Sequence, residues 1–511
     1  MSTTLSILED QTSPILFPLT LLFLLLPLIF LLSKRSLKRS PILPPGPFGW
    51  PIIGNIFQIG SNPHQTFAHL AKSYGPLFSL KLGTQLVVVG SSPAAAMEIL
   101  KTHDRNLSAR FVPHVAPAKS LEASDSSLGW VGECNDSWKY LRTVCKTELF
   151  SGKAINSQAN IRDQKVIEML GFVAKMKGEV VKIREIAFAA ILNMLSNIMV
   201  SRDLAELEYE SLNGGICGLM RKITDVASSP NISDFYPFLG PFDLQNLQKK
   251  AKELCNKACE MWDQIIEERK QRKTSEIDSC PDGDFLDSLI KQGFSNDQIN
   301  VLFVELFSAG TETSSSTVEW TMAELIRNPR CLKIVQEELA REIGEDLVKE
   351  SDLPKLSYLQ ACVKEILRLH PAGPLLLPHR AAESCTVMNY TIPKDSQVIV
   401  NVWAIGRNPS CWKEPLEFEP ERFLNSSLDF KGNDFEFFPF GSGRRICPGM
   451  SMAAKQIPLI VASLIHSFDW SLPQGMIPND IDMAEKFGLA MRMEQPLLLI
   501  PKAKTNIEKN N

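Results

Sequence analysis

Residues 440–449 read FGSGRRICPG, which places a single cysteine, Cys447, among glycines and after two arginines. A cysteine binds a metal only as the thiolate, and a thiolate needs hydrogen-bond donors or positive charge close by. The glycines allow the backbone to pass close to a flat ligand and to direct N–H groups at the sulfur. Arg444 and Arg445 supply positive charge for an anionic partner. The stretch therefore indicates that Cys447 is a metal ligand beside an anionic group.

The chain has 511 residues and a mass of 57.1 kDa, enough for one large domain with an extensive core or for two or three average domains. Hydrophobic residues make up 44% and charged residues 22%, which is ordinary for a folded protein. The net charge is only -4, and no basic stripe is present. Nucleic acid is therefore excluded as an expected partner.

The N-terminal segment from Gln11 to Ser33 carries no charged residue and is long enough to cross a bilayer as a helix. The basic stretch KRSLKR follows it directly, which places the remainder of the chain in the cytosol by the positive-inside rule. A cleaved signal peptide is the alternative, but its apolar core would be shorter and would end at small residues. We expect a luminal tail and transmembrane anchor at 1–33, a basic and proline-rich hinge at 34–47, and a catalytic domain at 48–511.

The sequence after the hinge predicts a mainly α fold with minor β structure. Alternation and β-branched residues predict two paired strands within Leu77–Gly90 and a second β-rich patch near Thr386–Val402. A long helix is predicted from a capping box at Ser295 to Asn328, just before a proline. Its centre, AGTETSSST, contains poor helix formers, which indicates either a functional site or a tightly packed helix crossing.

The loop pattern F-x-x-G-x-R-x-C-x-G fixes five positions and resembles the haem-binding loop of the cytochrome P450 superfamily. The resemblance implies a cytochrome P450 fold with haem b as cofactor and Cys447 as the axial thiolate ligand of its iron. The matching positions are Phe440, Gly443, Arg445, Cys447 and Gly449.

Two further motifs resemble elements of the same family. Glu365 and Arg368 lie one helical turn apart and, with Arg422 of the PERF segment, resemble an ion-pair lock beside the haem loop. Trp138 and Arg142 resemble the W-x-x-x-R element that binds a haem propionate, and both side chains are pure donors. A surface ion pair and a core tryptophan are the alternatives when each motif is taken alone.

The family resemblance assigns further roles around the haem. Arg445 is expected to hold a propionate, with His379 as an additional partner, although many plant relatives carry arginine there. The stretch AGTET resembles the oxygen-activating motif, in which Gly310 makes room for dioxygen while Glu312 and Thr313 relay protons. A haem-binding sensor has little use for this acid and alcohol, so we expect a monooxygenase.

The chain carries no dinucleotide-binding motif, so its electrons have to come from a partner. The resemblance implies NADPH-cytochrome P450 reductase in the same endoplasmic reticulum membrane, with a single-pass anchor and a cytosolic catalytic domain. We expect a lipophilic small-molecule substrate, although each residue expected to line its pocket could equally be core. These residues are Phe111, Val112, Phe307, Leu375 to Leu377 and Phe487 to Leu489.

Four stretches resemble the plant alkaloid branch of the family more closely than the neighbouring geraniol 8-hydroxylase branch. They are ILKTHDRNLSAR (99–110), CTVMNYTIPKD (385–395), RFLNSSLDFKGNDFE (422–436) and EKFGL (485–489). This branch includes N-methylcoclaurine 3'-hydroxylase, corytuberine synthase and littorine mutase. The resemblance implies ring hydroxylation or phenol coupling of a benzylisoquinoline alkaloid, with a littorine-type rearrangement or a geraniol-type hydroxylation as alternatives.

Overall fold

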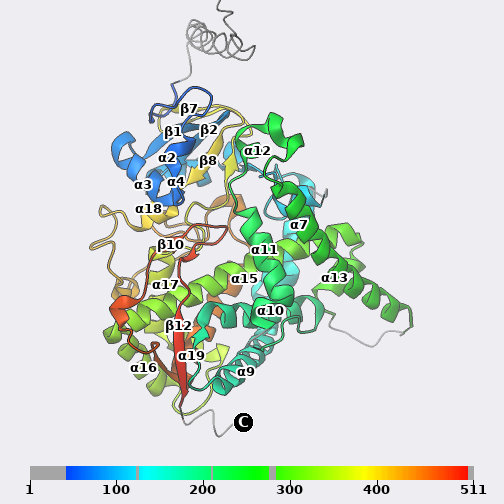
Figure 1. Cartoon of the computed structure of the whole chain (residues 1–511), viewed down its shortest axis with the longest axis vertical. Helices are drawn as coiled ribbons and strands as arrows, with labels where there is room; N and C mark the ends of the chain where they lie inside the picture. The colour runs from blue at the N-terminus through cyan, green and yellow to red at the C-terminus, as the bar shows by residue number, and fades with distance from the viewer. Residues whose placement is uncertain (1–41, 122–125, 209–210, 276–282, 505–511) are drawn as a thin grey trace, which may run out of the picture.

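A computed structural model of the chain describes residues 42–121, 126–208, 211–275 and 283–504. The expected anchor at Gln11–Ser33 and the basic residues after it lie outside the described residues, and the three-part division stays a prediction. The described chain forms a large helical body with a smaller sheet-containing end, so the predicted mainly α fold with minor β is confirmed (Figure 1).

The sheet-containing end is built around a five-stranded sheet in the order β1-β2-β8-β5-β3. Its first two strands pair antiparallel, with Leu77 opposite Gly90, and the return strand β8 runs parallel to β2. Both predicted β regions are therefore confirmed, and the second region joins this sheet through β8. The strands of this sheet are β1 (Leu77–Leu82), β2 (Gln85–Gly90), β3 (Ala109–Arg110), β5 (His379–Arg380) and β8 (Gln397–Val400).

The smaller sheets lie outside this layer. A hairpin joins β6 (Cys385–Val387) to β7 (Tyr390–Ile392), and a second short pair joins β10 (Glu485–Lys486) to β11 (Arg492–Met493). A three-stranded sheet in the order β4-β12-β9 closes the opposite end of the molecule. Its strands are β4 (Val181–Lys182), β9 (Phe468–Ser471) and β12 (Leu498–Ala503).

The proline-rich segment before the body packs on the sheet instead of standing free as a spacer. Ser79 of β1 donates its backbone N–H to Pro45 O at 2.8 Å and its hydroxyl to Pro44 O at 2.7 Å. Gly46 follows at a point where a Cβ atom would lie 1.7 Å from Ser79 O. The prolines lack an N–H, but their carbonyl groups still accept hydrogen bonds, which attaches the segment to the edge strand.

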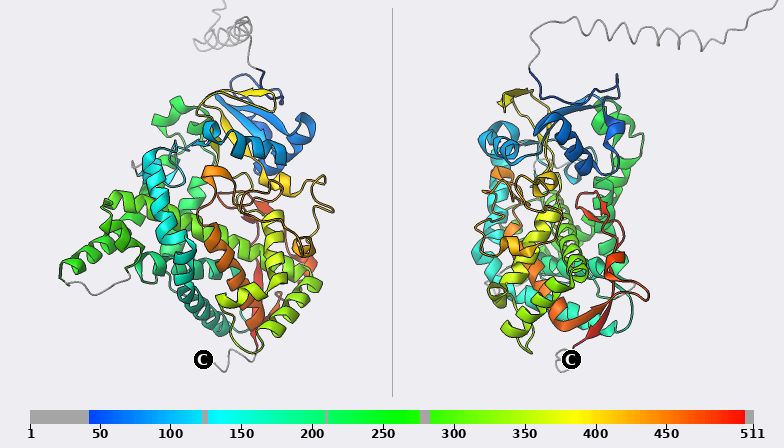
Figure 2. Two further views of the ribbon diagram at one scale, coloured as in Figure 1. Left: turned by 180° about the vertical axis from the view of Figure 1, so that it is seen from behind. Right: turned by 90° about the vertical axis from the view of Figure 1, so that its left-hand side faces the viewer.

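The helical body makes up the larger part of the molecule in both views of Figure 2. Its α-helices are α7 (Asp136–Cys145), α8 (Gly152–Ser157), α9 (Ala159–Lys175), α10 (Ile183–Val200), α11 (Gly215–Ala227), α13 (Leu247–Ser275), α14 (Phe285–Lys291), α15 (Asn296–Arg327), α16 (Pro329–Glu342), α17 (Ser357–Leu369) and α19 (Met450–Ser467). Short helices at the sheet end and in the connections are α2 (Ile56–Ile59), α3 (Pro63–Tyr74), α4 (Pro93–Met97), α5 (Asp104–Leu107), α6 (Pro117–Ser120), α12 (Ile232–Phe235) and α18 (Val402–Gly406).

Helix α15 crosses the body and packs against α10, α11, α13, α17 and α19. The predicted capping box is present, because Ser295 Oγ accepts the Gln298 N–H and the Gln298 side chain accepts the Ser295 N–H. Helix α10 is apolar and long enough to cross a membrane, but 83% of it is buried inside the protein. It is therefore a core helix that packs along α15.

The predicted ion-pair lock is confirmed. Arg368 binds both carboxylate oxygens of Glu365 at 2.7 Å, and Arg422 Nε binds the same carboxylate at 3.2 Å. The side chains of Glu365 and Arg368 are fully buried, and Arg368 also donates to the carbonyl groups of Gly406 and Pro415. The lock joins α17 to the segment that leads into the loop at 440–449.

Candidate active site

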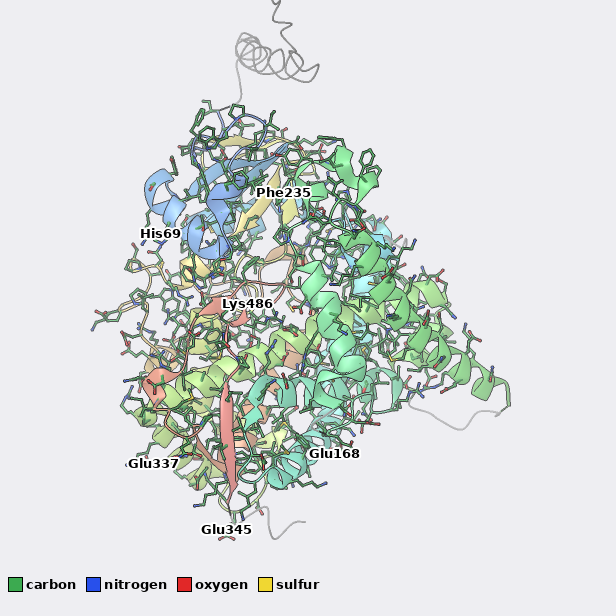
Figure 3. The ribbon with its side chains drawn as sticks, viewed as in Figure 1. His69, Glu168, Phe235, Glu337, Glu345 and Lys486 are labelled. Atoms are coloured by element: carbon green, nitrogen blue, oxygen red, sulfur yellow. The ribbon has the colours of Figure 1, made fainter. Side chains whose placement is uncertain are left out.

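A cavity lies between the middle of α15 and the loop at 439–449. Its walls are mostly apolar, and they include residues from the segments 128–130 and 372–377 and from the turn between β10 and β11. Lys486, labelled in Figure 3, lies on β10, and the chain continues from it to Leu489 and Ala490 in the cavity wall. The cavity therefore brings together segments from both halves of the sequence.

Cys447 lies half-buried in the cavity wall, between a 3₁₀ turn (Gly443–Arg445) and α19. Its own N–H donates to Phe440 O at 2.9 Å, which closes the loop behind the sulfur. Burial raises the pKa of the thiol, while the N–H groups of Gly449 and Met450 and the positive charge of Arg142 favour the thiolate. These donors are the compensation that a thiolate metal ligand needs.

Two glycines of the loop are required by the backbone. Gly441 and Gly443 adopt φ of 74° and 70°, and a Cβ on Gly443 would lie 2.2 Å from Leu100 O. Gly449 differs, since its φ is -81° and a Cβ there would lie 3.9 Å from Cys447 Sγ. Gly449 therefore lies beside the sulfur, where it lines the cavity together with Phe440.

Three arginines from distant parts of the chain meet at one end of the cavity: Arg110, Arg142 and Arg445. Within the described residues, no Asp or Glu oxygen lies within 4.0 Å of any of them. Their side chains donate hydrogen bonds to backbone carbonyl groups, and Arg445 Nη1 is buried without a hydrogen-bond partner among the described residues. Burial and the neighbouring Arg445 lower the pKa of Arg110 to about 9. This uncompensated positive charge fits a cofactor that carries carboxylates, such as the two propionates of haem.

Trp138 is not among the residues that line the cavity, and its expected role as a propionate donor stays a prediction. It is buried, and its indole N–H donates to Leu128 O at 2.9 Å. Its ring instead packs against two of the arginines, with Arg445 Cζ 4.6 Å and Arg142 Cζ 5.4 Å from the ring centre. Trp138 therefore positions the guanidinium groups through cation–π contacts.

His379 lies on β5 in the cavity wall, and its expected role as a propionate partner stays a prediction. Its Nδ1–H donates to Leu107 O at 2.7 Å, and burial together with Arg110 holds the pKa of the ring well below its usual value. In this state the other ring nitrogen carries a lone pair, so His379 needs a second proton before it can donate to a carboxylate. An anion beside it would favour that proton.

The acid and the alcohol of the AGTET stretch both line the cavity from α15. Glu312 is buried, and its Oε1 accepts from Arg184 of α10 at 2.9 Å and lies 3.7 Å from Arg492 Nη1 of β11. Its second oxygen, Oε2, is buried and has no hydrogen-bond partner in the part of the chain that the structure describes. Thr313 Oγ1 donates to Ala309 O at 2.7 Å. The pair can therefore hold and pass a proton at the cavity side of the helix.

Gly310 lies where α10 crosses α15. A Cβ at this position would lie 2.7 Å from Leu195 Cδ1 of α10, so the glycine permits the close approach of the two helices. It also lines the cavity. Gly310 therefore fits both predictions for the centre of this helix, a functional site and a tightly packed helix crossing.

The expected pocket residues are confirmed only in part. Leu376, Leu377 and Leu489 line the cavity. Phe307 does not, because its ring is fully buried and stacks on Trp262 with 4.7 Å between ring centres. Phe111, Val112, Leu375 and Phe487 are likewise absent from the wall.

Sequence reasoning missed several residues that the fold brings to the site: Arg110, Arg184, Glu305 and Arg492. None belongs to a short motif, and each acquires its role only through contacts with residues far away in the sequence.

Comparisons with known proteins agree with this site. The family model for cytochrome P450 matches residues 44–500. The chain is 49% identical to the probable (S)-N-methylcoclaurine 3'-hydroxylase isozyme 2 of Coptis japonica, over 94% of this chain and 97% of that protein. It is 49% identical to (S)-N-methylcoclaurine 3'-hydroxylase isozyme 1 of Papaver somniferum, over 93% and 98%, and 46% identical to corytuberine synthase of Coptis japonica, over 94% and 99%.

These relatives are similar over nearly the whole chain, and their names describe enzymes. The monooxygenase interpretation is therefore confirmed over the haem-binding sensor. Members of this family carry haem-thiolate iron, take electrons from a redox partner, act on small molecules and, in microsomal members, associate with membranes. The chain belongs to the cytochrome P450 family.

Proposed function

We propose that the protein is an NADPH- and dioxygen-dependent oxidase of plant specialised metabolism that acts on an aromatic benzylisoquinoline alkaloid. Ring hydroxylation and phenol coupling are the two proposed outcomes. The similarity to (S)-N-methylcoclaurine 3'-hydroxylases and to corytuberine synthase, over at least 93% of the chain, carries this proposal. The mostly apolar cavity beside Cys447 supports a lipophilic, aromatic substrate.

The proposed cofactor site uses the residues at one side of the cavity. Cys447 would bind the iron of haem b, while Arg142, Arg445, His379 and the newly found Arg110 would bind its propionates. Phe440 and Gly449 would lie against the macrocycle beside the sulfur, and Trp138 would position the arginines. When bound, the haem supplies the oxidising chemistry, and the protein supplies its orientation and charge balance.

On the opposite side, Glu312 and Thr313 would deliver protons to the reaction. Arg184 and Arg492 hold the Glu312 carboxylate, and the Thr313 hydroxyl, which also lines the cavity, can accept and donate a proton there. Gly310 also lines the cavity beside these groups, where it would give dioxygen room.

The electron donor and the location belong to the same proposal. NADPH-cytochrome P450 reductase would supply electrons at the endoplasmic reticulum membrane, with the catalytic domain in the cytosol. Exposed apolar side chains at the sheet end support membrane contact. They are Ile42, Phe48, Trp50, Ile52 and Phe57, together with Phe238, Phe242 and Leu244, and each is at least 61% exposed.

A competition assay tests the proposed substrate class. Microsomes that contain this protein and the reductase are incubated with NADPH and equal amounts of N-methylcoclaurine, reticuline, littorine and geraniol, and the loss of each compound is measured. We expect consumption of N-methylcoclaurine or reticuline. Consumption of littorine alone would favour the tropane rearrangement, and consumption of geraniol alone would move the protein to the terpenoid branch.

A further inference from the structure

One buried carboxylate in the cavity wall has no role in the proposed proton delivery. Glu305 lies on α15, one helical turn before Ala309, and only 8% of it is exposed. Its Oε1 accepts from the Ser127 hydroxyl, and its Oε2 accepts from the N–H groups of Leu128 at 2.8 Å and Gly129 at 3.2 Å. Three donors from one loop therefore contact this carboxylate.

All three of these donors are neutral. Among the described residues, no Lys, Arg or His nitrogen lies within 4.0 Å of Glu305. Other buried carboxylates are paired with a cation, such as Glu312 with Arg184 and Glu350 with Arg162. Glu338 also lacks a cation, but it binds N–H groups at the start of α17, where the helix dipole offsets its charge. Glu305 has no such helix end.

The geometry leaves Glu305 with spare capacity to bind a cation. An ionised carboxylate offers about four acceptor positions, and three are occupied here. Burial raises the pKa of Glu305, although the three hydrogen bonds and the more distant charge of Arg445 oppose this rise. The cavity walls are mostly apolar, and Trp130, which follows the 127–129 loop, also lines the cavity. A positive charge in the cavity would be stabilised by both the carboxylate and the aromatic face.

We propose that Glu305 is the counter-ion for a protonated amine on the substrate, so that the cavity selects lipophilic ammonium compounds over neutral ones of the same shape. The proposal rests on the proposed function, because a benzylisoquinoline alkaloid carries a basic ring nitrogen. The alternative is that Glu305 only fastens the loop at 127–129 to α15.

A matched pair of ligands separates the two roles. N-methyl-1-benzyltetrahydroisoquinoline is a cation at neutral pH, and 1-benzyl-2-methyltetralin is its neutral carbocyclic counterpart. Their dissociation constants are measured by equilibrium dialysis with the haem-loaded wild type and with Glu305→Gln and Ser127→Ala. Glu305→Gln removes the charge, whereas Ser127→Ala weakens the loop contact and keeps the charge.

We expect Glu305→Gln to weaken amine binding by about thirtyfold or more and to change tetralin binding by no more than about twofold. Ser127→Ala should affect both ligands equally. Equal losses for both ligands in Glu305→Gln would overturn the counter-ion role. If that variant does not fold, the wild type decides the question, because it should bind the amine at least about tenfold more tightly than the tetralin, and equal affinities would overturn the proposal.

The outcomes also separate this proposal from the proposed function. If microsomes oxidise the alkaloids but Glu305→Gln weakens the binding of the amine and the tetralin equally, the proposed function stands and the counter-ion role fails. If amine binding is selectively lost while no alkaloid is oxidised, the counter-ion role stands and the substrate assignment fails.

Discussion

Arg110 is a residue that lowers the stability of the haem-free protein and would help to bind the haem. It is buried beside Arg445, and within the described residues no carboxylate lies within 4.0 Å of it. Its pKa falls to about 9 from an ordinary 12.5. The folded protein thus loses the Arg110 proton more readily than the unfolded chain does. The charged guanidinium therefore lowers the folding stability by its full amount below pH 9, and this destabilisation is relieved as pH rises from about 9 towards 12.5.

We predict opposite effects of Arg110→Leu in the two states. At pH 7 the variant apoprotein should be more stable than the wild-type apoprotein by about 1–4 kcal/mol, because a buried charge is removed. The same variant should retain less haem, because a propionate partner is lost. Denaturant melts of the apoprotein and haem content after gel filtration measure the two effects. Lower stability of the variant apoprotein together with full haem retention would contradict this account of the cluster.

At the scale of elements, the crossing of α10 and α15 at Gly310 makes a prediction about packing. Gly310→Ala places a methyl group against Leu195 and should destabilise the protein by about 1–3 kcal/mol. Leu195→Ala opens the same space, so the double variant should be less destabilised than the sum of the single variants. Thermal melts of the three variants test this. Strict additivity would show that the glycine is not required by the crossing.

The ion-pair lock makes a second prediction at this scale. Arg368→Leu removes one of the two arginines that bind the fully buried Glu365. It should lower the free energy of unfolding by about 3–5 kcal/mol. Arg341→Leu, which removes an exposed pair with Glu342 on α16, should cost at most about 1 kcal/mol. Chemical denaturation with haem absorbance as the readout compares them. If the two variants lost similar amounts of unfolding free energy, the lock would not be one of the interactions that stabilise the loop.

The elements also show what could and could not be predicted from the sequence. The ends of α15 follow from a capping box and a proline, and the β1-β2 hairpin follows from alternation, because these signals are local. Cys447 and Glu312 were predicted because each lies in a short motif. Arg110 and Glu305 were missed because their environments are made by loops more than a hundred residues away or by strand pairing, neither of which a local pattern encodes.

At the scale of the whole molecule, two segments far apart in sequence form one end of the protein. Tyr236 donates its hydroxyl to Ile52 O at 3.2 Å, and Thr84 donates its N–H to Phe235 O at 3.0 Å. Figure 3 shows Phe235 at the sheet end, where the described chain also begins. The exposed apolar residues of both segments therefore lie at one end of the molecule, where a lipid surface would bury them.

We predict that a protein lacking residues 1–41 still binds phosphatidylcholine vesicles. Replacement of Phe238, Phe242 and Leu244 by serine should weaken binding by about tenfold per side chain, because each loses apolar area in the lipid. Leu416→Ser and Ile477→Ser are matched controls, since these residues are also exposed but belong to other segments. Vesicle sedimentation measures the binding. Equal effects of the control and test substitutions would show that this end is not the membrane contact.

The most direct test of the central claim is to follow the fate of dioxygen during alkaloid turnover. The membrane-bound protein, the reductase and NADPH are incubated with N-methylcoclaurine and, separately, with reticuline under oxygen-18 gas, and product masses are measured. The account predicts either a product with one added oxygen-18 atom or a coupled product that has lost two hydrogen atoms. Neither alkaloid being altered, or an added oxygen that comes from water, would contradict it.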